Sequence, residues 1–364
     1  MHTAASLRDS LTDCGVTVPI DATPLESGYV MPAEWERHSA TWISWPKNPY
    51  SFPKEILPEV EESYLGIITA LAKGETVNLL VDDELAAKRI ESIIESRGIN
   101  SNNVRLHRIR TSDVWFRDYG PIFVKNCKTG NIAYTHWEFN AWGGKYDDLK
   151  QDCTVPKSMP LQGLPKFDVP MVLEGGSIDV NGLGTCLTTE QCLLNRNRNP
   201  SMDRGRIESY LRDYLGATHV VWLGNGLEGD DTDGHVDDLA RFVSKDTVVC
   251  AYEEDESDSN HAALEENFRI LENATDQAGS KIDIVKIPMP KAVVYEGQRL
   301  PASYTNFYVA NGAVLVPTFR DANDDEALGV LKRLFKTREV IGIDCRSLVY
   351  GFGAIHCVTQ QQPA

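Results

Sequence analysis

Apolar residues recur at intervals of three and four in five stretches of this chain, and each stretch is followed by a short β-rich run. That interval is typical of an amphipathic helix, so the sequence predicts helices over residues 59–73, 84–97, 203–215, 261–278 and 324–336. The β-rich runs predict strands over residues 76–81, 104–109, 218–223, 281–287 and 339–343. Because helices and strands alternate, the predicted fold class is α/β.

Predicted β-hairpins lie between the helices. Asn181-Gly182 and Asn311-Gly312 are strong two-residue turn signals, and Lys245-Asp246 plays the same part between β-rich residues 239–243 and 247–252. The turns at positions 181, 246 and 311 are evenly spaced, 65 residues apart. A unit of hairpin, helix and strand therefore recurs, and five such units would fill the chain. A ring of five units would close on itself and leave no open sheet edge.

We expect one domain over residues 1–364. Two α/β domains are the alternative, but no stretch rich in Pro, Gly or Ser separates two halves, and charged residues 253–258 are expected to form a solvated loop. Residues 1–32 have weak periodicity and are predicted to be a surface lead-in. Residues 39–46 are predicted to be a short strand that ends at a proline.

Composition narrows the class of partner. The 364 residues carry a formal net charge of −17, which argues against nucleic acid and anionic membranes and favours a small cation. The eight cysteines form no CxxC pair, and the first 21 residues lack an apolar signal core, so we expect reduced thiols and a cytoplasmic location. No apolar run approaches the ~18 residues of a membrane-spanning helix.

Residues with reactive side chains stand just before the hairpins, at 115–121, 174–177, 230–238, 300–303 and in the chain end at 351–364. Units arranged in a ring would bring these equivalent loops to one end. That arrangement would gather Asp118, Glu174, His235, Asp237 and Cys357 at one site.

The chemistry of this set is specific. Cys357 follows a glycine-broken loop, which gives a substrate access to sulfur, and a thiolate is a soft nucleophile. His235 can move protons near neutral pH. The carboxylates of Asp118 and Asp237 can hold a guanidinium through paired, charge-assisted hydrogen bonds. The set therefore suits attack on a cationic amidine carbon better than attack on a peptide carbonyl.

Each candidate also has a plainer interpretation. Asp118 could form an ion pair with Arg117, Glu174 could bind loop amides, and Trp115 could belong to the core instead of stacking on a flat cation. The spacing of His235 and Asp237 places both on one face of a strand.

A metal site is the main rival chemistry. Its ligands would be His235, Asp231, Asp233, Asp237 and Cys357. No second histidine stands at HxxxH or HxH spacing, and His356 would point to the opposite face from Cys357, so we expect no metal and no cofactor. A Cys-His amide hydrolase and a polyamine-binding protein are further alternatives.

At these residues the chain resembles the agmatine deiminases of the wider guanidine-modifying, or pentein, superfamily. The matching stretches are residues 31–36 (MPAEWE), 115–121 (WFRDYGP), 137–145 (WEFNAWGGK), 173–177 (LEGGS), 233–237 (DGHVD) and 355–361 (IHCVTQQ). The resemblance implies a five-bladed α/β propeller that converts agmatine to N-carbamoylputrescine and ammonia, on the way to putrescine. An arginine or peptidyl-arginine deiminase of the same fold is the alternative, and its substrate carboxylate would need an arginine such as Arg117 or Arg241. We also expect a homo-oligomer, a dimer or higher.

The resemblance also implies roles for single residues. Cys357 would form a covalent amidino-cysteine intermediate, and His235 would act first as a general acid and then as a base. Asp118 and Asp237 would hold the guanidinium. Trp115 and Glu174 would line the pocket, and Asp231 would face the far amine of the substrate.

The chain departs from the family pattern in two places. Relatives have a more glycine-rich run where this chain has Phe352 and Ala354, and often a longer Glu where it has Asp231. These departures concern the backbone of the nucleophile loop and the selectivity for the length of the substrate tail.

Overall fold

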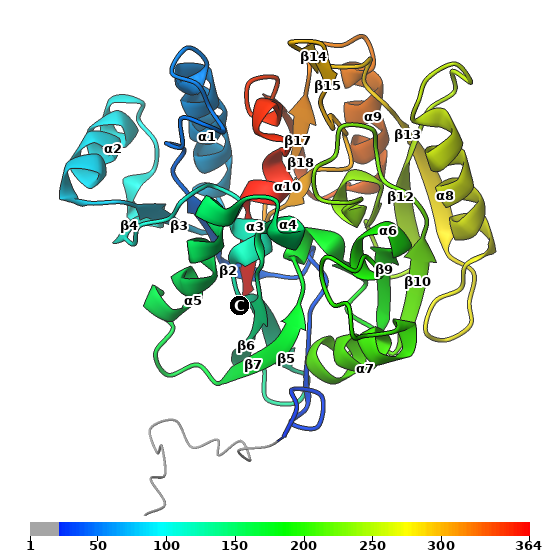
Figure 1. Cartoon of the computed structure of the whole chain (residues 1–364). Helices are drawn as coiled ribbons and strands as arrows, with labels where there is room; N and C mark the ends of the chain where they lie inside the picture. Colours follow the sequence, from blue (N-terminus) through cyan, green and yellow to red (C-terminus); the bar gives the residue numbers. More distant parts are fainter. Residues whose placement is uncertain (1–21) are drawn as a thin grey trace, which may run out of the picture.

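The computed structural model describes residues 22–364, and five long helices dominate its outer side (Figure 1). They are α1 (Leu57–Leu71), α2 (Glu84–Ser96), α7 (Arg204–Leu215), α8 (His261–Asn273) and α9 (Asp324–Leu334). Each connects two parallel strands, and its apolar stripe faces the sheets. In α1 the fully buried side chains are Val60, Tyr64, Ile67 and Ile68. Burial of such side chains stabilises the fold by about 1.5–3 kcal/mol each.

Five sheets share one pattern among the described residues. Each contains an antiparallel pair next to a parallel pair, in the orders β19-β2-β3-β4, β1-β5-β6-β7, β10-β9-β8, β11-β12-β13 and β16-β17-β18. A separate two-stranded hairpin joins β14 (Val294–Tyr295) to β15 (Gln298–Arg299). The predicted turns at 181, 246 and 311 each lie inside one of the sheets, so the hairpin, helix and strand unit is confirmed.

The bounds of the sheet strands follow the same repeat. The first part of the chain forms β1 (Tyr29–Val30), β2 (His38–Ser44), β3 (Thr76–Val81), β4 (Val104–Arg108), β5 (Ile122–Asn126), β6 (Ile132–Glu138) and β7 (Lys166–Val172). The middle forms β8 (Asp179–Val180), β9 (Thr185–Thr189), β10 (His219–Leu223), β11 (Ala240–Phe242), β12 (Thr247–Tyr252) and β13 (Asp283–Pro288). The last part forms β16 (Tyr308–Val309), β17 (Ala313–Thr318), β18 (Glu339–Asp344) and β19 (Gln360–Pro363).

The predicted helices and strands agree with these bounds, with two corrections. Helix α8 ends at Asn273, five residues before the predicted end, because Ala274 is extended and Thr275 bridges to Lys281 around a turn. The prediction that residues 1–32 form a surface segment is wrong for residues 29–31. Tyr29 and Met31 are buried, and β1 pairs with β5. Residues 1–21 lie outside the described part of the chain.

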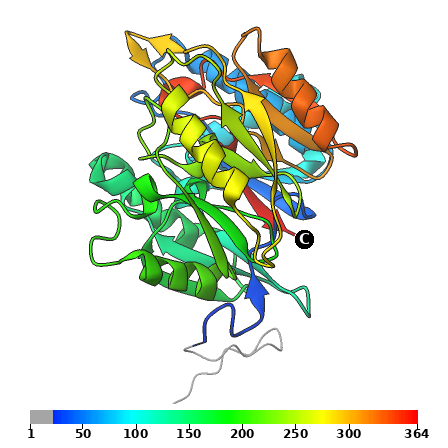
Figure 2. The ribbon, with the colours of Figure 1, turned by 90° about the vertical axis from the view of Figure 1, so that its right-hand side faces the viewer.

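The last strand joins the first sheet. β19 pairs antiparallel with β2, and Gln360 lies opposite Trp42. Figure 2 shows this red strand beside the blue strand β2. The pairing anchors α10 (Ile355–Val358), which directly precedes β19 and packs on α3 (Phe116–Tyr119) near the middle of Figure 1. Among residues 22–364, no helix is both long enough and apolar enough to cross a membrane.

Candidate active site

Gly176 marks the point where three reactive side chains meet. It lies in the short turn η3 (Gly175–Ser177), and a Cβ on it would come within 2.6 Å of His235 Nδ1 and 3.0 Å of both Asp118 Oδ1 and Asp237 Oδ2. His235 and Asp237 come from one loop, Asp118 from α3 and Gly176 from η3. The structure therefore brings the predicted carboxylates and the imidazole around one point, and only a glycine leaves room for them.

Cys357 approaches the same place from the chain end. It lies in the single turn of α10, with Sγ 3.7 Å from Asp237 Oδ2. Gly353 gives it space, because a Cβ there would lie 3.1 Å from Sγ and 2.5 Å from the Trp115 ring. Phe352 has a φ of +71°, in the left-handed region that a glycine adopts without strain. Phe352, one of the two departures from the glycine-rich family pattern, thus stands at a left-handed backbone position.

The surroundings of Cys357 favour the neutral thiol when the site is empty. Burial raises the pKa of this thiol well above its ordinary value, and the carboxylates of Asp237, Asp238 and Asp118 raise it further. The side chain of Asn306 offsets part of this effect, since its Nδ2 donates to Sγ at 3.1 Å. A cation placed among these carboxylates would shift the thiol towards the thiolate.

His235 is buried between two carboxylates. Its Nδ1 lies 3.8 Å from Asp118 Oδ1, and its Nε2 lies 4.0 Å from Glu174 Oε2. Burial lowers the pKa of the imidazole, but Asp118, Cys192 and Glu174 together raise it well above its ordinary value. The ring is therefore protonated near neutral pH and suited to donate a proton first. The predicted strand is wrong here, because η4 (Val236–Asp238) is a 3₁₀ turn that follows His235.

The two aspartates differ in their contacts. Asp118 accepts hydrogen bonds from Gly176 N at 3.1 Å and Trp142 Nε1 at 3.0 Å, while Arg117 is turned elsewhere. Burial raises the pKa of Asp118 to about 6 despite the nearby His235. Burial would also raise the pKa of Asp237, but His356 holds it below its ordinary value. One carboxylate is thus firmly ionised and the other titrates near neutrality.

Glu174 and Trp115 form further walls of the site. Glu174 is fully buried, and its Oε1 accepts a hydrogen bond from Arg198 Nε at 2.7 Å. Its Oε2 faces His235 Nε2 at 4.0 Å, too far for a hydrogen bond, and acts on the imidazole through its charge. Trp115 lines the cavity and packs against Phe52, with ring centroids 6.1 Å apart. It is both a core residue and a pocket wall.

A cavity of about 360 Å³ opens above Cys357. Four carboxylates line it, from Asp118, Asp148, Asp231 and Glu296, and no Lys or Arg does so in the described part of the chain. The Oδ2 atom of Asp231 accepts a hydrogen bond from the Tyr146 hydroxyl. This lining accepts an elongated cation and provides no counter-charge for an anion.

The two arginines suggested for binding a substrate carboxylate do not face the cavity. Arg117 is buried and donates to Gln360, Gln361 and the carboxylate of Glu34. Arg241 is fully buried and pairs with Glu34 and with Asp179. Both stabilise the interior behind the site.

Three residues with contacts at the site had no predicted role there: Asn306, Trp142 and Glu34. Asn306 lies three residues beyond the loop at residues 300–303, and its Oδ1 also accepts from His356 N at 2.9 Å. Trp142 and Glu34 stand inside stretches that carry the resemblance but have no assigned role there. The repeat itself provides the signal for Asn306, since the residues just before each hairpin meet at the site.

Two groups of buried side chains have atoms suited to a metal. Glu174, Cys192 and His235 form one, and Asp237, Asp238 and Cys357 form the other, with the ligand atoms of each group within 4.8 Å of one another. In the first group, Arg198 already neutralises Glu174. The second includes the proposed nucleophile. Neither matches the rival metal site of the sequence analysis, which combined His235, Asp231, Asp233, Asp237 and Cys357.

Comparison with known proteins places this site in a family. Residues 30–363 match the model of the Porphyromonas-type peptidyl-arginine deiminase family. The chain is 38% identical to an agmatine deiminase of Medicago truncatula, over 95% of this chain and 99% of the relative. It is 36% identical to an agmatine deiminase of Pseudomonas aeruginosa, over 94% of this chain and 98% of the relative.

The solved structures similar to this chain include agmatine deiminases. The agmatine deiminase of Enterococcus faecalis matches with a TM-score of 0.86 and 33% identity, covering 96% of this chain and 99% of that one. A cysteine-to-serine variant of the Campylobacter jejuni agmatine deiminase, with substrate bound, matches with a TM-score of 0.82 and 31% identity, covering 92% and 96%.

Proposed function

Because the chain belongs to the Porphyromonas-type peptidyl-arginine deiminase family, we propose that it hydrolyses agmatine to N-carbamoylputrescine and ammonia, in putrescine biosynthesis. The observation that carries this proposal is the meeting of Cys357, His235, Asp118 and Asp237 at one place. Cys357 and Asp118 line a cavity that also contains further carboxylates, and His235 and Asp237 lie buried directly behind them. Agmatine is a guanidinium joined to an amine, so both of its ends are cations, and this lining suits both.

Binding places the guanidinium between Asp118 and Asp237. Each carboxylate accepts N–H groups of the flat cation through charge-assisted hydrogen bonds. The positive charge opposes the carboxylates that raise the pKa of the Cys357 thiol, so the thiol releases its proton to solvent as substrate binds. Trp115 borders the tail, and Asp231, with Asp148 and Glu296 nearby, faces the far amine.

The reaction then takes two steps. The Cys357 thiolate attacks the guanidinium carbon, the imidazolium of His235 gives a proton to one terminal nitrogen, and ammonia leaves. This breaks one C–N bond and leaves an amidino group on sulfur. Neutral His235 then takes one proton from a water molecule whose oxygen attacks the same carbon. The C–S bond breaks, the remaining hydroxyl proton passes to the departing sulfur and regenerates the thiol, and the urea product leaves. Glu174 acts on His235 through its charge in both steps.

A deiminase of free or peptidyl arginine is the alternative within the family, and the family's name favours it. Such a substrate carries a carboxylate or a peptide group beside the side chain. The cavity lining argues against free arginine, because its carboxylate would meet Asp148, Asp231 and Glu296 with no arginine or lysine in the lining as described. This repulsion between like charges would weaken the binding of free arginine.

We also propose that the whole chain is one domain with the five sheets arranged as a closed five-bladed propeller. The shared antiparallel-then-parallel pattern supports five equivalent blades. The pairing of β19 with β2 supports closure, because it joins the last strand to the second described strand in one blade.

The cytoplasmic location rests on the cysteines. Seven of them, Cys14 lying outside the described residues, are free thiols in the structure. A reducing compartment keeps such thiols unpaired. The homo-oligomer and the lack of nucleic-acid binding remain predictions, which light scattering and gel-shift measurements check.

The decisive functional test compares ammonia release from agmatine and from arginine. Agmatine is expected to be the far better substrate, and the Cys357→Ser variant is expected to release no ammonia from either compound. Preference for arginine would reverse the assignment of substrate. Full activity of Cys357→Ser would remove the covalent mechanism.

A further inference from the structure

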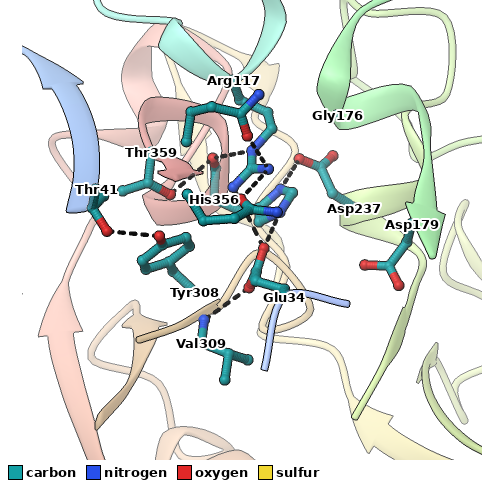
Figure 3. Close-up of polar contacts among 12 residues, drawn as sticks. Glu34, Thr41, Arg117, Gly176, Asp179, Asp237, Tyr308, Val309, His356 and Thr359 are labelled. Atoms are coloured by element: carbon teal, nitrogen blue, oxygen red, sulfur yellow. Dashed lines mark hydrogen bonds and ion pairs between the residues drawn. The ribbon is translucent and has the colours of Figure 1, made fainter. Parts of the chain in front are cut away.

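A buried histidine next to the nucleophile has no part in the proposed reaction. The ring of His356 lies between two carboxylates, with Nδ1 2.7 Å from Asp237 Oδ2 and Nε2 2.9 Å from Glu34 Oε2 (Figure 3). It is only 2% exposed. Glu34 comes from the loop between β1 and β2, so the contact links the start of the described chain to its last turn.

Both ring nitrogens of His356 face acceptors. An ionised carboxylate accepts hydrogen bonds and donates none, so each nitrogen has to carry a hydrogen and the ring is an imidazolium. Burial raises the pKa of Glu34, but Arg241, His356 and Arg117 together hold it well below its ordinary value. The ring therefore sits against one permanently ionised partner.

Glu34 itself cannot turn away. Its Oε1 accepts a hydrogen bond from Val309 N at 2.8 Å and pairs with Arg241 Nη2 at 2.9 Å. Its Oε2 lies 3.4 Å from Arg117 Nη2 and 2.9 Å from His356. Figure 3 shows these contacts converging on Glu34 from several loops. The orientation of the His356 ring is consequently set from the side away from the substrate.

The contact with His356 leaves Asp237 with one free oxygen. Its Oδ2 is bound to His356 and lies 3.7 Å from the sulfur of Cys357. Its Oδ1 is buried and has no hydrogen-bond partner within residues 22–364. A buried unsatisfied carboxylate oxygen is costly, and an incoming N–H group would remove that cost.

We infer that His356 is a positioning residue, fixed by Glu34, that holds the carboxylate of Asp237 with Oδ1 turned to the guanidinium. The inference rests on the proposed function, because it assigns a ligand to the free oxygen. His356 touches neither substrate nor the reacting atoms in this account. It acts through Asp237 alone.

Two substitutions separate the contacts of the ring. The amide nitrogen of Asn occupies roughly the position of Nδ1, so His356→Asn keeps a donor towards Asp237. The amide nitrogen of Gln corresponds to Nε2, so His356→Gln keeps only the donor towards Glu34. If His356 had only a structural role, there would be no reason for His356→Gln to bind substrate more weakly than His356→Asn.

The test measures agmatine binding by calorimetry with every variant in the Cys357→Ser background, which prevents turnover. His356→Gln is expected to weaken binding on the order of tenfold, and His356→Asn less. Added to Asp237→Asn, His356→Gln is expected to cause no further loss, since the carboxylate it positions is gone. Unchanged affinity of His356→Gln, or losses that multiply with Asp237→Asn, would overturn the inference.

His136 provides the matched control. It lies in β6 and also places both ring nitrogens on acceptors, with Nδ1 2.9 Å from Asp168 Oδ1 and Nε2 3.3 Å from the Cys153 carbonyl oxygen, neither of which belongs to the site. His136→Gln is expected to leave agmatine affinity unchanged. An equal loss of affinity in this variant would mean that the effect is not specific to His356, and the inference would fail.

The remaining outcomes are also informative. If the Cys357→Ser parent does not bind agmatine, the proposed function fails before His356 is tested. If His356→Gln does not fold, Glu34→Gln replaces it, because this change keeps the ring and removes the charge that fixes it. The expected loss is smaller, and it again disappears in the Asp237→Asn background. A loss that persists there would count against the inference.

Discussion

Gly176 shows how closely the residues of the site are fitted to one another. Its Cα faces His235, Asp118 and Asp237, and a single added carbon would fall inside contact distance of all three. The residue types in this set were predictable from the sequence, because each belongs to a short stretch with recognisable chemistry. The contacts of Asn306 and His356 were not predictable, because they depend on which way the α10 turn directs the side chains of Cys357 and His356. Asn306 contacts the first of these, and Asp237 contacts the second.

Gly176→Ala is expected to displace the imidazole and both carboxylates and to lower kcat/KM by about 30-fold or more, the scale of one disrupted buried charged contact. Gly312→Ala is the control, since a Cβ there meets no atom within 4 Å. Steady-state kinetics and melting temperature check both variants. Wild-type kinetics for Gly176→Ala would mean that the site is more open than described.

Substrate binding should depend on pH through Asp118. Its pKa is raised to about 6, so the carboxylate gains a proton and loses its charge as pH falls through that value. Agmatine affinity, measured in the Cys357→Ser background, is expected to fall on acidification with a midpoint near pH 6. Asp118→Asn is expected to bind weakly with that midpoint missing. An affinity that does not change between about pH 5 and pH 8 would contradict the role of Asp118.

At the scale of elements, local patterns predicted most of the scaffold and less of the loops. The long helices have continuous apolar stripes, and α1, α2 and α7 also end near glycines, so the bounds of all five are recovered within two residues except in α8. The stretch around His235 is too short for its spacing to distinguish a strand from a turn, and the 3₁₀ turn η4 packs against η3, β9 and β11. Tertiary contacts decide such segments.

The scaffold helices should tolerate changes that leave the site intact. The side chain of Asp203 caps α7 by accepting a hydrogen bond from Arg206 N at 2.9 Å. Asp203→Ala is expected to lower the free energy of unfolding by about 1 kcal/mol, the usual effect of losing such a cap, with kcat/KM unchanged. Denaturant unfolding and kinetics measure the two quantities. A matching loss of activity would show that α7 supports the site directly.

At the scale of the whole molecule, the fold concentrates part of the negative charge of the chain at the mouth of the cavity. The chain has a net charge of −17, and the cavity mouth adds Asp148, Asp231 and Glu296 without a neighbouring cation in its lining among described residues. Net charge could be read from the sequence, but its concentration at this mouth could not, because Glu296 belongs to the separate β14–β15 hairpin.

Electrostatic attraction at this mouth should appear in the kinetics. The kcat/KM for agmatine is expected to fall as ionic strength rises, since salt screens exposed charges over about 10 Å at 0.1 M. The double variant Asp148→Asn with Glu296→Gln should have a lower kcat/KM and a weaker salt dependence. A variant with the wild-type salt profile would place the attraction elsewhere on the surface.

The central claim is that Cys357 bonds to the guanidinium carbon, and mass spectrometry of protein quenched during turnover with agmatine tests it most directly. The account predicts that the peptide containing Cys357 gains the mass of agmatine less one ammonia, and that Cys357→Ser gains nothing. Ammonia release with no such adduct on any peptide, at a quench time when turnover is under way, would contradict it.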